Sequence, residues 1–194
     1  MKLLVTSRLP SPWGTYSISA FGMEGDRFPH VVLHRGVEGT LSTESPLSVR
    51  VHSECMTGDV FASQRCDCGE QLHNALKHFK QHGGMLIYLR QEGRGIGLVE
   101  KLKAYNLQDE GLNTYEANAA MGHGEDERQY SDAVEILTHY KVKSVRLLTN
   151  NPEKEQALRK AGVDVAERIP LRGTETADNA DYLRAKKEIT GHLF

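Results

Sequence analysis

The sequence has no strong excess of charge of either sign and no long hydrophobic run. Its 194 residues contain 24 lysines and arginines against 26 aspartates and glutamates, a formal net charge of −2. Such a chain is not drawn as a whole to nucleic acid or to an anionic membrane, so an anionic ligand must meet a local group of basic residues. The first apolar run reaches Arg8 and Pro10 too soon for an export signal or a membrane span, which predicts a cytoplasmic protein.

Cysteine is also scarce. The chain has three, an odd number that cannot be fully paired, and disulfides are not expected in a chain without an export signal. Cys55, Cys66 and Cys68 lie close together in the sequence. Thiolates bind zinc readily, and three protein ligands leave the fourth tetrahedral position to water, as in a catalytic zinc site. The spacing alone leaves two alternatives open, namely buried inert thiols and a structural site closed by His52 or His73.

The chain contains no internal repeat, low-complexity tract or long linker. Its length and its 39% hydrophobic content suit one domain over residues 1–194. The N-terminal part is turn-rich with short β-like runs at 16–21 and 31–33, and from Leu47 onward strands alternate with helices. This pattern predicts an α/β fold, α+β-like in character, with a mixed β-sheet, flanking helices and a β-rich N-terminal part.

The periodicity also places the individual elements of the second part. Further strands are predicted at 47–52, 85–89, 144–148 and 163–167, and the run 85–89 is apolar throughout, as in a strand buried on both faces. Helices are predicted at 69–82, at 97–109, from 125 through Leu137 and from Pro152 onward, where proline suits a first helical position. Residues 172–179, rich in Thr and acidic side chains, are predicted to form a surface loop.

Two polar segments follow predicted strands. Residues 91–98 form a glycine-rich turn whose backbone N–H groups could bind an anion, although a plain strand-to-helix turn explains it equally well. Arg90 and Arg94 offer guanidinium forks for phosphate, and Glu92 offers an acceptor for a base. The segment Thr149-Asn-Asn-Pro152, with Lys154, occupies the matching position after 144–148 and suits phosphate contacts or ordinary N-capping.

Residues 125–128, Glu-Asp-Glu-Arg, are predicted to begin a helix, because acidic side chains complement the dipole at a helix start. An arginine at such a position often only pairs with its acidic neighbours. Taken alone, the segment is best interpreted as a solvated helix start.

Many short motifs recur together along the chain. They are Arg50-Val-His-Ser-Glu-Cys55, Thr57-Gly-Asp59, Arg65-Cys-Asp-Cys-Gly69, Arg90-Gln-Glu-Gly-Arg94, Gly95-Ile-Gly-Leu98, Tyr105-x-Leu-Gln-Asp109, Glu116-Ala-Asn118, Asp126-x-Arg128, Leu147-Leu-Thr-Asn-Asn-Pro152 and Glu167-Arg-x-Pro170. In this register the sequence resembles GTP cyclohydrolase II. The resemblance implies conversion of GTP to 2,5-diamino-6-ribosylamino-4(3H)-pyrimidinone 5′-phosphate, formate and pyrophosphate, the first step of riboflavin biosynthesis. It also implies one zinc ion per subunit, Mg²⁺ with the GTP phosphates, and a homodimer.

The resemblance also assigns residues. Cys55, Cys66 and Cys68 would hold zinc, which activates water for attack on C8 of guanine and then on the formamide. The residues that would bind GTP are Arg50, Val51, His52, Ser53, Glu54, Gln71, Glu92, Gly93, Arg94, Thr114, Thr149 and Lys154. Tyr105 would lie beside the reacting carbon, Asp126 would be the general base and Arg128 the nucleophile on the α-phosphorus. Because a guanidinium is almost always protonated, stabilising phosphoryl charge is the more usual work of arginine.

Residues 172–181 are shorter than the polar loop usual in the family, and Ala185 stands where threonine is common, which bears on closure over the substrate. The length also implies the form without a second synthase domain. Four alternatives remain: a paralogue that stops at the formamido compound or serves another pathway, a zinc-stabilised nucleotide-binding module without turnover, a zinc nucleobase deaminase, and an RNA-binding protein. The Cys-x-Cys pair disfavours the deaminase, and the absence of a basic face or an aromatic platform motif disfavours the RNA-binding protein.

Overall fold

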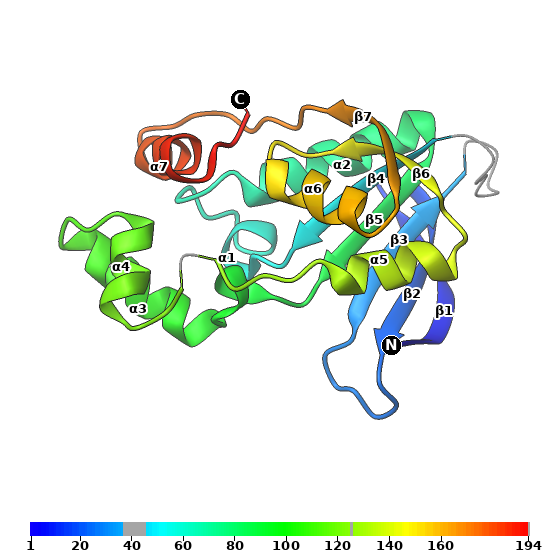
Figure 1. The fold of residues 1–194 in the computed structure, drawn as a ribbon, viewed down its shortest axis with the longest axis horizontal. Coiled ribbons are helices and arrows are strands. Elements are labelled where there is room, and N and C mark those ends of the chain that lie inside the picture. The colour runs from blue at the N-terminus through cyan, green and yellow to red at the C-terminus, as the bar shows by residue number, and fades with distance from the viewer. Residues whose placement is uncertain (37–45, 125, 194) are drawn as a thin grey trace.

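The computed structural model describes residues 1–36, 46–124 and 126–193 (Figure 1). Within these residues, seven strands form a mixed sheet in the order β1-β2-β3-β5-β4-β6-β7, which confirms the predicted α/β class. The strands are β1 (Lys2–Ser11), β2 (Gly14–Gly22), β3 (His30–Arg35), β4 (Leu47–Ser53), β5 (Gly84–Leu89), β6 (Ser144–Leu148) and β7 (Asp164–Ile169). The helices are α1 (Met56–Asp59), α2 (Cys68–His82), the 3₁₀ turn η1 (Glu92–Gly95), α3 (Leu98–Asp109), α4 (Thr114–Ala120), α5 (Ser131–His139), α6 (Pro152–Lys160) and α7 (Ala180–Thr190).

The sheet has an antiparallel half and a parallel half. Strands β1, β2 and β3 pair in succession, and β3 runs antiparallel to β5. Strands β5, β4, β6 and β7 are parallel, so their connections cross over through helices and their carboxyl ends lie at one edge. Helices α3, α4 and α7 lie beyond that edge (Figure 1). Loops and helices far apart in the sequence therefore meet there.

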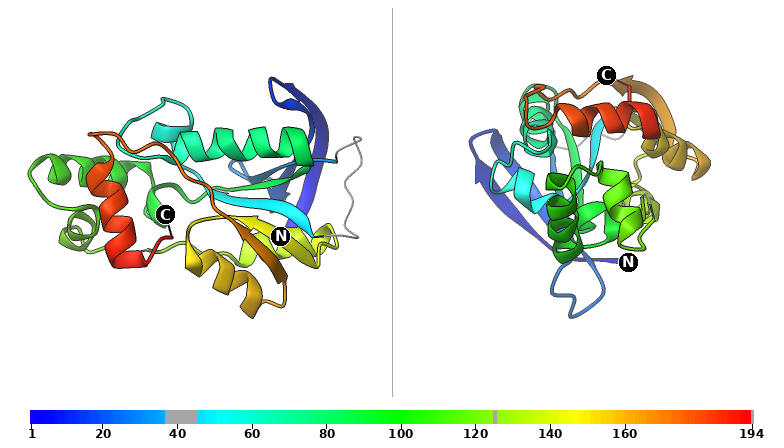
Figure 2. Two further views of the ribbon diagram at one scale, coloured as in Figure 1. Left: turned by 90° about the horizontal axis from the view of Figure 1, so that it is seen from above. Right: turned by 90° about the vertical axis from the view of Figure 1, so that its left-hand side faces the viewer.

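Strand β4 shows how the two faces of the sheet are divided. Leu47, Val49 and Val51 belong to the larger core, which packs against α5 and α6. Alternate side chains face α2, where His78 contacts the Ser48 hydroxyl at 3.1 Å. A second core with Ala75, Leu76 and Phe79 of α2 lies on this face, and Figure 2 shows α2 on one side of the sheet and α6 on the other. Because side chains of a strand point alternately to the two faces of a sheet, half of those of β4 pack in the larger core and the other half face α2.

Most predicted elements are confirmed. The strands at 16–21, 31–33, 47–52, 85–89 and 144–148 lie within observed strands, 163–167 overlaps β7, and the helices at 69–82, 97–109 and from Pro152 correspond to α2, α3 and α6. Residues 172–179 form the predicted loop. The sequence reasoning missed β1, α1, α4 and α7. An Asn113–Glu116 capping box at the start of α4 was a usable signal, whereas β1 contains Pro10, which an edge strand tolerates.

The prediction that a helix begins at 125–128 was wrong. Helix α5 begins at Ser131, and Glu125 lies outside the described residues. The Asp126 carboxylate accepts from the Arg128 backbone N–H at 3.1 Å, and the Glu127 N–H donates to the Arg94 carbonyl at 3.0 Å. These contacts replace the helical ones and attach the segment to the glycine-rich turn. None of the described helices is long and apolar enough to cross a membrane.

Candidate functional site

A pocket opens at the carboxyl edge of the parallel strands and contains most of the predicted site residues. Those that line it are Arg50, His52, Ser53, Glu54, Cys55, Cys66, Cys68, Gln71, Glu92, Gly93, Arg94, Tyr105, Thr114, Arg128, Thr149 and Lys154. They come from β4 and the residues after it, from α2 and the loop before it, from η1, α3 and α4, from the segment before α5, and from the β6–α6 connection and the first turn of α6. The topology therefore brings together side chains that the sequence places about a hundred residues apart.

Two predicted residues do not line the pocket. The Val51 side chain is buried in the core beside α5 and α6, and its carbonyl accepts from the Lys154 ammonium at 2.9 Å. Asp126 is bound to the guanidinium of Arg128, which does line the pocket. Both residues therefore act on the pocket through a partner, Val51 by holding Lys154 and Asp126 by holding Arg128.

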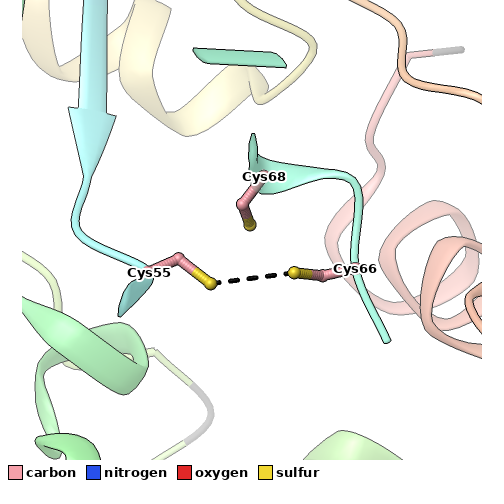
Figure 3. Close-up of side chains that lie close together, drawn as sticks. All are labelled: Cys55, Cys66 and Cys68. Atoms are coloured by element: carbon pink, nitrogen blue, oxygen red, sulfur yellow. Dashed lines mark hydrogen bonds between the residues drawn. The ribbon is translucent and has the colours of Figure 1, made fainter. Parts of the chain in front are cut away.

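The three cysteines converge, as Figure 3 shows. Cys55 follows β4, Cys66 lies just before α2, and Cys68 is the first residue of α2. Their sulfur atoms all lie within 4.8 Å of one another, with 3.7 Å between those of Cys55 and Cys66. Within the described part of the chain this is the one group of His, Cys, Asp and Glu side chains placed to hold a metal ion. His52 and His73 do not join it, because His52 bonds to Asp59 and His73 stacks on Trp13.

Two glycines make this convergence feasible. A Cβ on Gly58 would lie 3.0 Å from the Cys66 sulfur and 3.3 Å from the Cys55 sulfur. A Cβ on Gly69 would lie 2.2 Å from the Gly58 carbonyl oxygen, well inside contact distance. Helices α1 and α2 can approach so closely only because both positions lack a side chain. Three soft sulfur donors around one point fit a thiophilic ion such as Zn²⁺.

Groups beside the cysteine cluster favour the thiolate form of Cys55. The Lys101 ammonium lies 3.1 Å from the Cys55 sulfur and 2.8 Å from a Glu92 oxygen. Hydrogen bonds from Cys66 and Cys68, together with Lys101, lower the pKa of the Cys55 thiol well below its ordinary value. The Thr57 hydroxyl contacts the Tyr105 hydroxyl at 3.2 Å. Lys101 was missed by the sequence reasoning, although its spacing of four from Tyr105 on a helix places both on one face.

Asp59 holds the residues next to the cysteine cluster in place. Its carboxylate accepts from the Cys55 backbone N–H at 3.0 Å, from the His52 ring at 3.0 Å and from the Tyr88 hydroxyl at 2.8 Å. The Asp59 side chain is only 3% exposed. Burial lowers the pKa of His52 even though Asp59 opposes this shift. One buried carboxylate thus fixes the ends of β4 and β5 and the first cysteine together.

The glycine-rich turn is held in an unusual conformation by Glu92. One Glu92 oxygen accepts from the Met56 N–H at 2.6 Å, and the other accepts from the Gly93 N–H at 2.7 Å. Gly93 and Arg94 both have left-handed backbones, with φ of 63° and 62°. The Arg94 guanidinium lies over the Tyr115 ring at 4.3 Å. The carboxylate therefore positions the turn and Arg94 rather than standing free for a ligand.

The other end of the pocket is rich in cations. Arg50 donates to the Leu148 carbonyl at 3.0 Å and to the Gln71 amide oxygen. Burial, followed by the charges of Arg50, Arg128 and Lys186, lowers the pKa of Lys154 well below its ordinary value. Helix α6, capped by Asn151, begins at the same place. Like charges gathered at a helix N-terminus are an arrangement that suits a polyanion.

Arg128 and Asp126 form a partly buried ion pair. The Arg128 Nε donates to both carboxylate oxygens, at 2.8 and 3.1 Å, and a second nitrogen also contacts Asp126. Burial by itself would lower the pKa of Arg128, but the hydrogen bonds to Asp126 raise it above its ordinary value. Burial would raise the pKa of Asp126, but hydrogen bonds from Arg128 lower it. Both groups are thereby held in their charged forms.

Three residues of the C-terminal segment line the pocket, and the sequence did not predict them. Tyr182, Lys186 and His192 line the pocket. The Tyr182 hydroxyl lies 3.9 Å from the Cys68 sulfur, and Lys186 pairs with Asp67 at 3.1 Å. Burial and the charges of Lys186, Arg128, Lys154 and Arg94 lower the pKa of His192 to about 3. No local motif marks these residues, because only the path of the chain after β7 returns them to the site.

Comparison with known proteins gives a consistent result. The sequence model of GTP cyclohydrolase II matches residues 2–170. The chain is 48% identical to the GTP cyclohydrolase-2 of Buchnera aphidicola over 194 residues, which cover 100% of this chain and 98% of the relative. It is 45% identical to that of Tolumonas auensis, with 100% and 97% covered, and 47% identical to that of Picrophilus torridus over 189 residues, with 97% and 96% covered.

One solved structure, a two-domain 3,4-dihydroxy-2-butanone 4-phosphate synthase from A. baumannii, is similar over 76% of this chain and 34% of its own. The TM-score is 0.40 and the sequence identity 15%, a likeness from which nothing follows about the site.

We expect Asp59→Asn to lower the free energy of unfolding by about 2 to 3 kcal/mol, because an amide cannot accept all three hydrogen bonds that reach the buried carboxylate. Urea denaturation measures this. Asp109→Asn is the matched control, since Asp109 pairs with Arg65 on the surface and its change should cost about 1 kcal/mol or less. Equal effects of the two substitutions would contradict the role given to Asp59.

We expect the His192 ring to titrate below pH 5, which an NMR titration assigned with His192→Gln measures. Its folded pKa of about 3 lies below the ordinary 6.5. The free energy that His192 contributes to the docked tail is therefore fully present above about pH 6.5 and is lost as the pH falls towards 3. A midpoint near 6.5 would show that the tail does not lie among Lys186, Arg128, Lys154 and Arg94.

Proposed function

The chain belongs to the GTP cyclohydrolase II family, and we propose that it hydrolyses GTP to 2,5-diamino-6-ribosylamino-4(3H)-pyrimidinone 5′-phosphate, formate and pyrophosphate, the first step of riboflavin biosynthesis. The observation that carries this proposal is that one pocket joins a three-thiol cluster to a group of buried cations. Hydrolysis of GTP to these products opens the ring of the base and cleaves the triphosphate. The thiol cluster is suited to the first reaction and the buried cations to the second.

We propose Zn²⁺ as the ion held by Cys55, Cys66 and Cys68, one per chain. The convergence of three sulfur atoms and the space that Gly58 leaves beside them support this choice. When bound, zinc would make a water molecule acidic enough to hydrolyse the imidazole ring. The protein's part is to hold the three sulfurs and to balance their charge with Lys101.

Tyr105 is proposed to act beside the reacting carbon of guanine. Its hydroxyl is held by Thr57, which itself lies 3.7 Å from the Cys55 sulfur. Burial raises the pKa of Tyr105, so the phenol stays protonated at neutral pH. It is therefore suited to donate a hydrogen bond, or a proton, to nitrogen or oxygen of the opening ring.

The cationic end is proposed to bind the triphosphate. Lys154, held by the Val51 carbonyl, lies near Arg50 and Arg128 at the start of α6. The two glutamates that line the pocket are both engaged, Glu54 with Arg90 at 3.0 Å and Glu92 with Lys101. Mg²⁺ would therefore be held mainly by phosphate oxygens and water, as is usual for this ion.

The remaining residues are proposed to bind GTP directly or to position those that do. Gln71 accepts from Arg50, and Ser53 accepts from Gln91 at 2.8 Å. We assign direct contacts to Arg50, Ser53, Gln71, Gly93, Arg94, Thr114, Thr149 and Lys154, and positioning to Val51, His52, Glu54 and Glu92. Positioning is assigned to the residues whose side chain is taken up in a protein ion pair, as in His52, Glu54 and Glu92, or lies outside the pocket, as in Val51.

We assign Arg128 to stabilising charge on the phosphoryl group rather than to nucleophilic attack. Its pKa is raised by Asp126, so a neutral guanidinium is even less accessible than usual. Asp126, whose pKa is lowered, is a weak base but a firm anchor for the guanidinium fork. Positioned charge of this kind accounts for a large part of phosphoryl-transfer catalysis.

We also propose a cytoplasmic homodimer of single-domain chains. Strand β1 forms an edge of the sheet that holds all the described strands, and Leu3, Leu4 and Val5 on it are 37%, 37% and 61% exposed. An open apolar edge strand of ten residues is a surface that proteins usually cover.

Light scattering is expected to give twice the 21.7 kDa mass of one chain, and Val5→Asp to shift it to one chain. A wild-type mass of one chain would contradict the dimer.

With GTP and Mg²⁺, the zinc-loaded protein is expected to release formate and pyrophosphate in equal amounts with the pyrimidine product. Cys66→Ser should lose formate release together with bound zinc, measured as metal freed on denaturation, because two thiolates hold the ion poorly. Pyrophosphate without formate in the wild type would indicate a paralogue that stalls at the formamide. Release of neither product would indicate a nucleotide-binding module.

Arg128→Ala is expected to lower kcat/KM for pyrophosphate release by about 100- to 1,000-fold, and Arg128→Lys to restore part of it, since a preorganised cation is lost and regained. Arg159→Ala, on the exposed face of α6, is the matched control and should leave turnover unchanged. Intact-mass measurement during turnover should show no nucleotide attached to the enzyme. An adduct mapped to Arg128 would instead establish the nucleophilic role.

A further inference from the structure

The chain after β7 is fastened over the pocket at both ends. Before α7, the Thr174 N–H and hydroxyl both donate to Glu70 of α2. After α7, Gly191 adopts a left-handed conformation with φ of 62°, and the Leu193 N–H donates to the Asn150 carbonyl at 2.9 Å. Helix α7 lies beyond the strand ends, with α3 and α4 (Figure 1). The segment is therefore a built wall of the site.

Lys186 stands between the two functional ends of that pocket. Its ammonium lies 3.1 Å from an oxygen of Asp67, whose side chain is fully buried. Asp67 stands between Cys66 and Cys68 in the sequence. The ammonium also lies 4.2 Å from the centre of the Tyr182 ring. Towards the other end, the charge of Lys186 contributes to lowering the pKa of Lys154 and of His192. Lys186 thus lies beside the loop that carries Cys66 and Cys68, and it lines the same pocket as Lys154 and His192.

His192 lies among the cations themselves. Lys186, Arg128, Lys154 and Arg94 all act on it, and two carboxylates, Asp67 and Asp126, pair with members of this group. Among the described residues of this group, four cations stand against these two carboxylates, and the His192 ring lines the same pocket as they do. A ligand carrying several negative charges would offset the repulsion within the group.

We propose that Lys186 and His192 bind the phosphates of GTP and make the site specific for the nucleoside triphosphate over less phosphorylated guanine nucleosides. Lys186 supplies charge and His192 supplies a ring nitrogen for hydrogen bonding, because α7 and the residues after it place both side chains in the pocket. This inference rests on the proposed function. It assigns a substrate-binding role to a segment beyond the 2–170 that match the family model.

The test measures KM for GTP alongside competition by guanosine, GMP and GDP. Lys186→Gln should raise KM for GTP by about ten-fold or more, because a charge-assisted hydrogen bond to phosphate is lost. The weakening should grow with the number of phosphates and leave the inhibition constant of guanosine within about two-fold. His192→Ala should show the same graded pattern with a smaller loss, and Lys186→Arg should recover part of the affinity.

Lys187→Gln is the matched control, since Lys187 is the next residue on α7 and is exposed. Zinc content is measured for each variant, because Lys186 contacts the loop that carries Cys66 and Cys68. An unchanged KM in Lys186→Gln and His192→Ala, or equal weakening of guanosine and GTP, would overturn the proposal while wild-type turnover still supports the proposed function. A wild type that releases neither formate nor pyrophosphate would instead overturn the proposed function.

Discussion

The buried carboxylate of Asp59 is the contact on which the rest of the site depends. It accepts from the Cys55 N–H, the His52 ring and the Tyr88 hydroxyl, so it ties together the ends of two parallel strands and the short helix after β4. Strand ends are otherwise the part of a sheet least restrained by ladder hydrogen bonds. A fixed end of β4 gives Cys55 a defined place, and the close approach of Gly58 and Gly69 then brings Cys66 and Cys68 to meet it.

The two ends of the pocket differ in charge. At the thiol end, Lys101 balances both the sulfur of Cys55 and the carboxylate of Glu92. At the other end, the charges of Arg128 and Lys186 act on both Lys154 and His192. A substrate with a reactive ring and a polyphosphate fits such a pocket in one orientation, with the ring at the thiols and the phosphates at the cations. The electrostatics thus supply a physical reason for the substrate that family membership suggests.

Several pocket residues carry out structural work that their motifs conceal. Glu92 lies in the glycine-rich turn, yet both of its oxygens hold the backbone of the turn and of α1. Asp126 binds the Arg128 guanidinium and keeps it charged. These contacts preorganise the cations and the turn before substrate arrives, which is how a site avoids reorganising during the reaction.

The sequence by itself determined the strands and helices with clear periodicity, such as the apolar strand 85–89 and the amphipathic helix α2, and it indicated the three cysteines, because these signals are local. It did not determine that 126–130 stays unwound, since the contacts of that segment with Arg94 and Gln91 come from a turn over thirty residues away. Nor did it indicate Lys101 as the partner of Cys55, or Lys186 and His192 as pocket residues. Only the tertiary structure decided these, because charges at the shared edge of parallel strands are brought together by the chain crossovers and not by their spacing in the sequence.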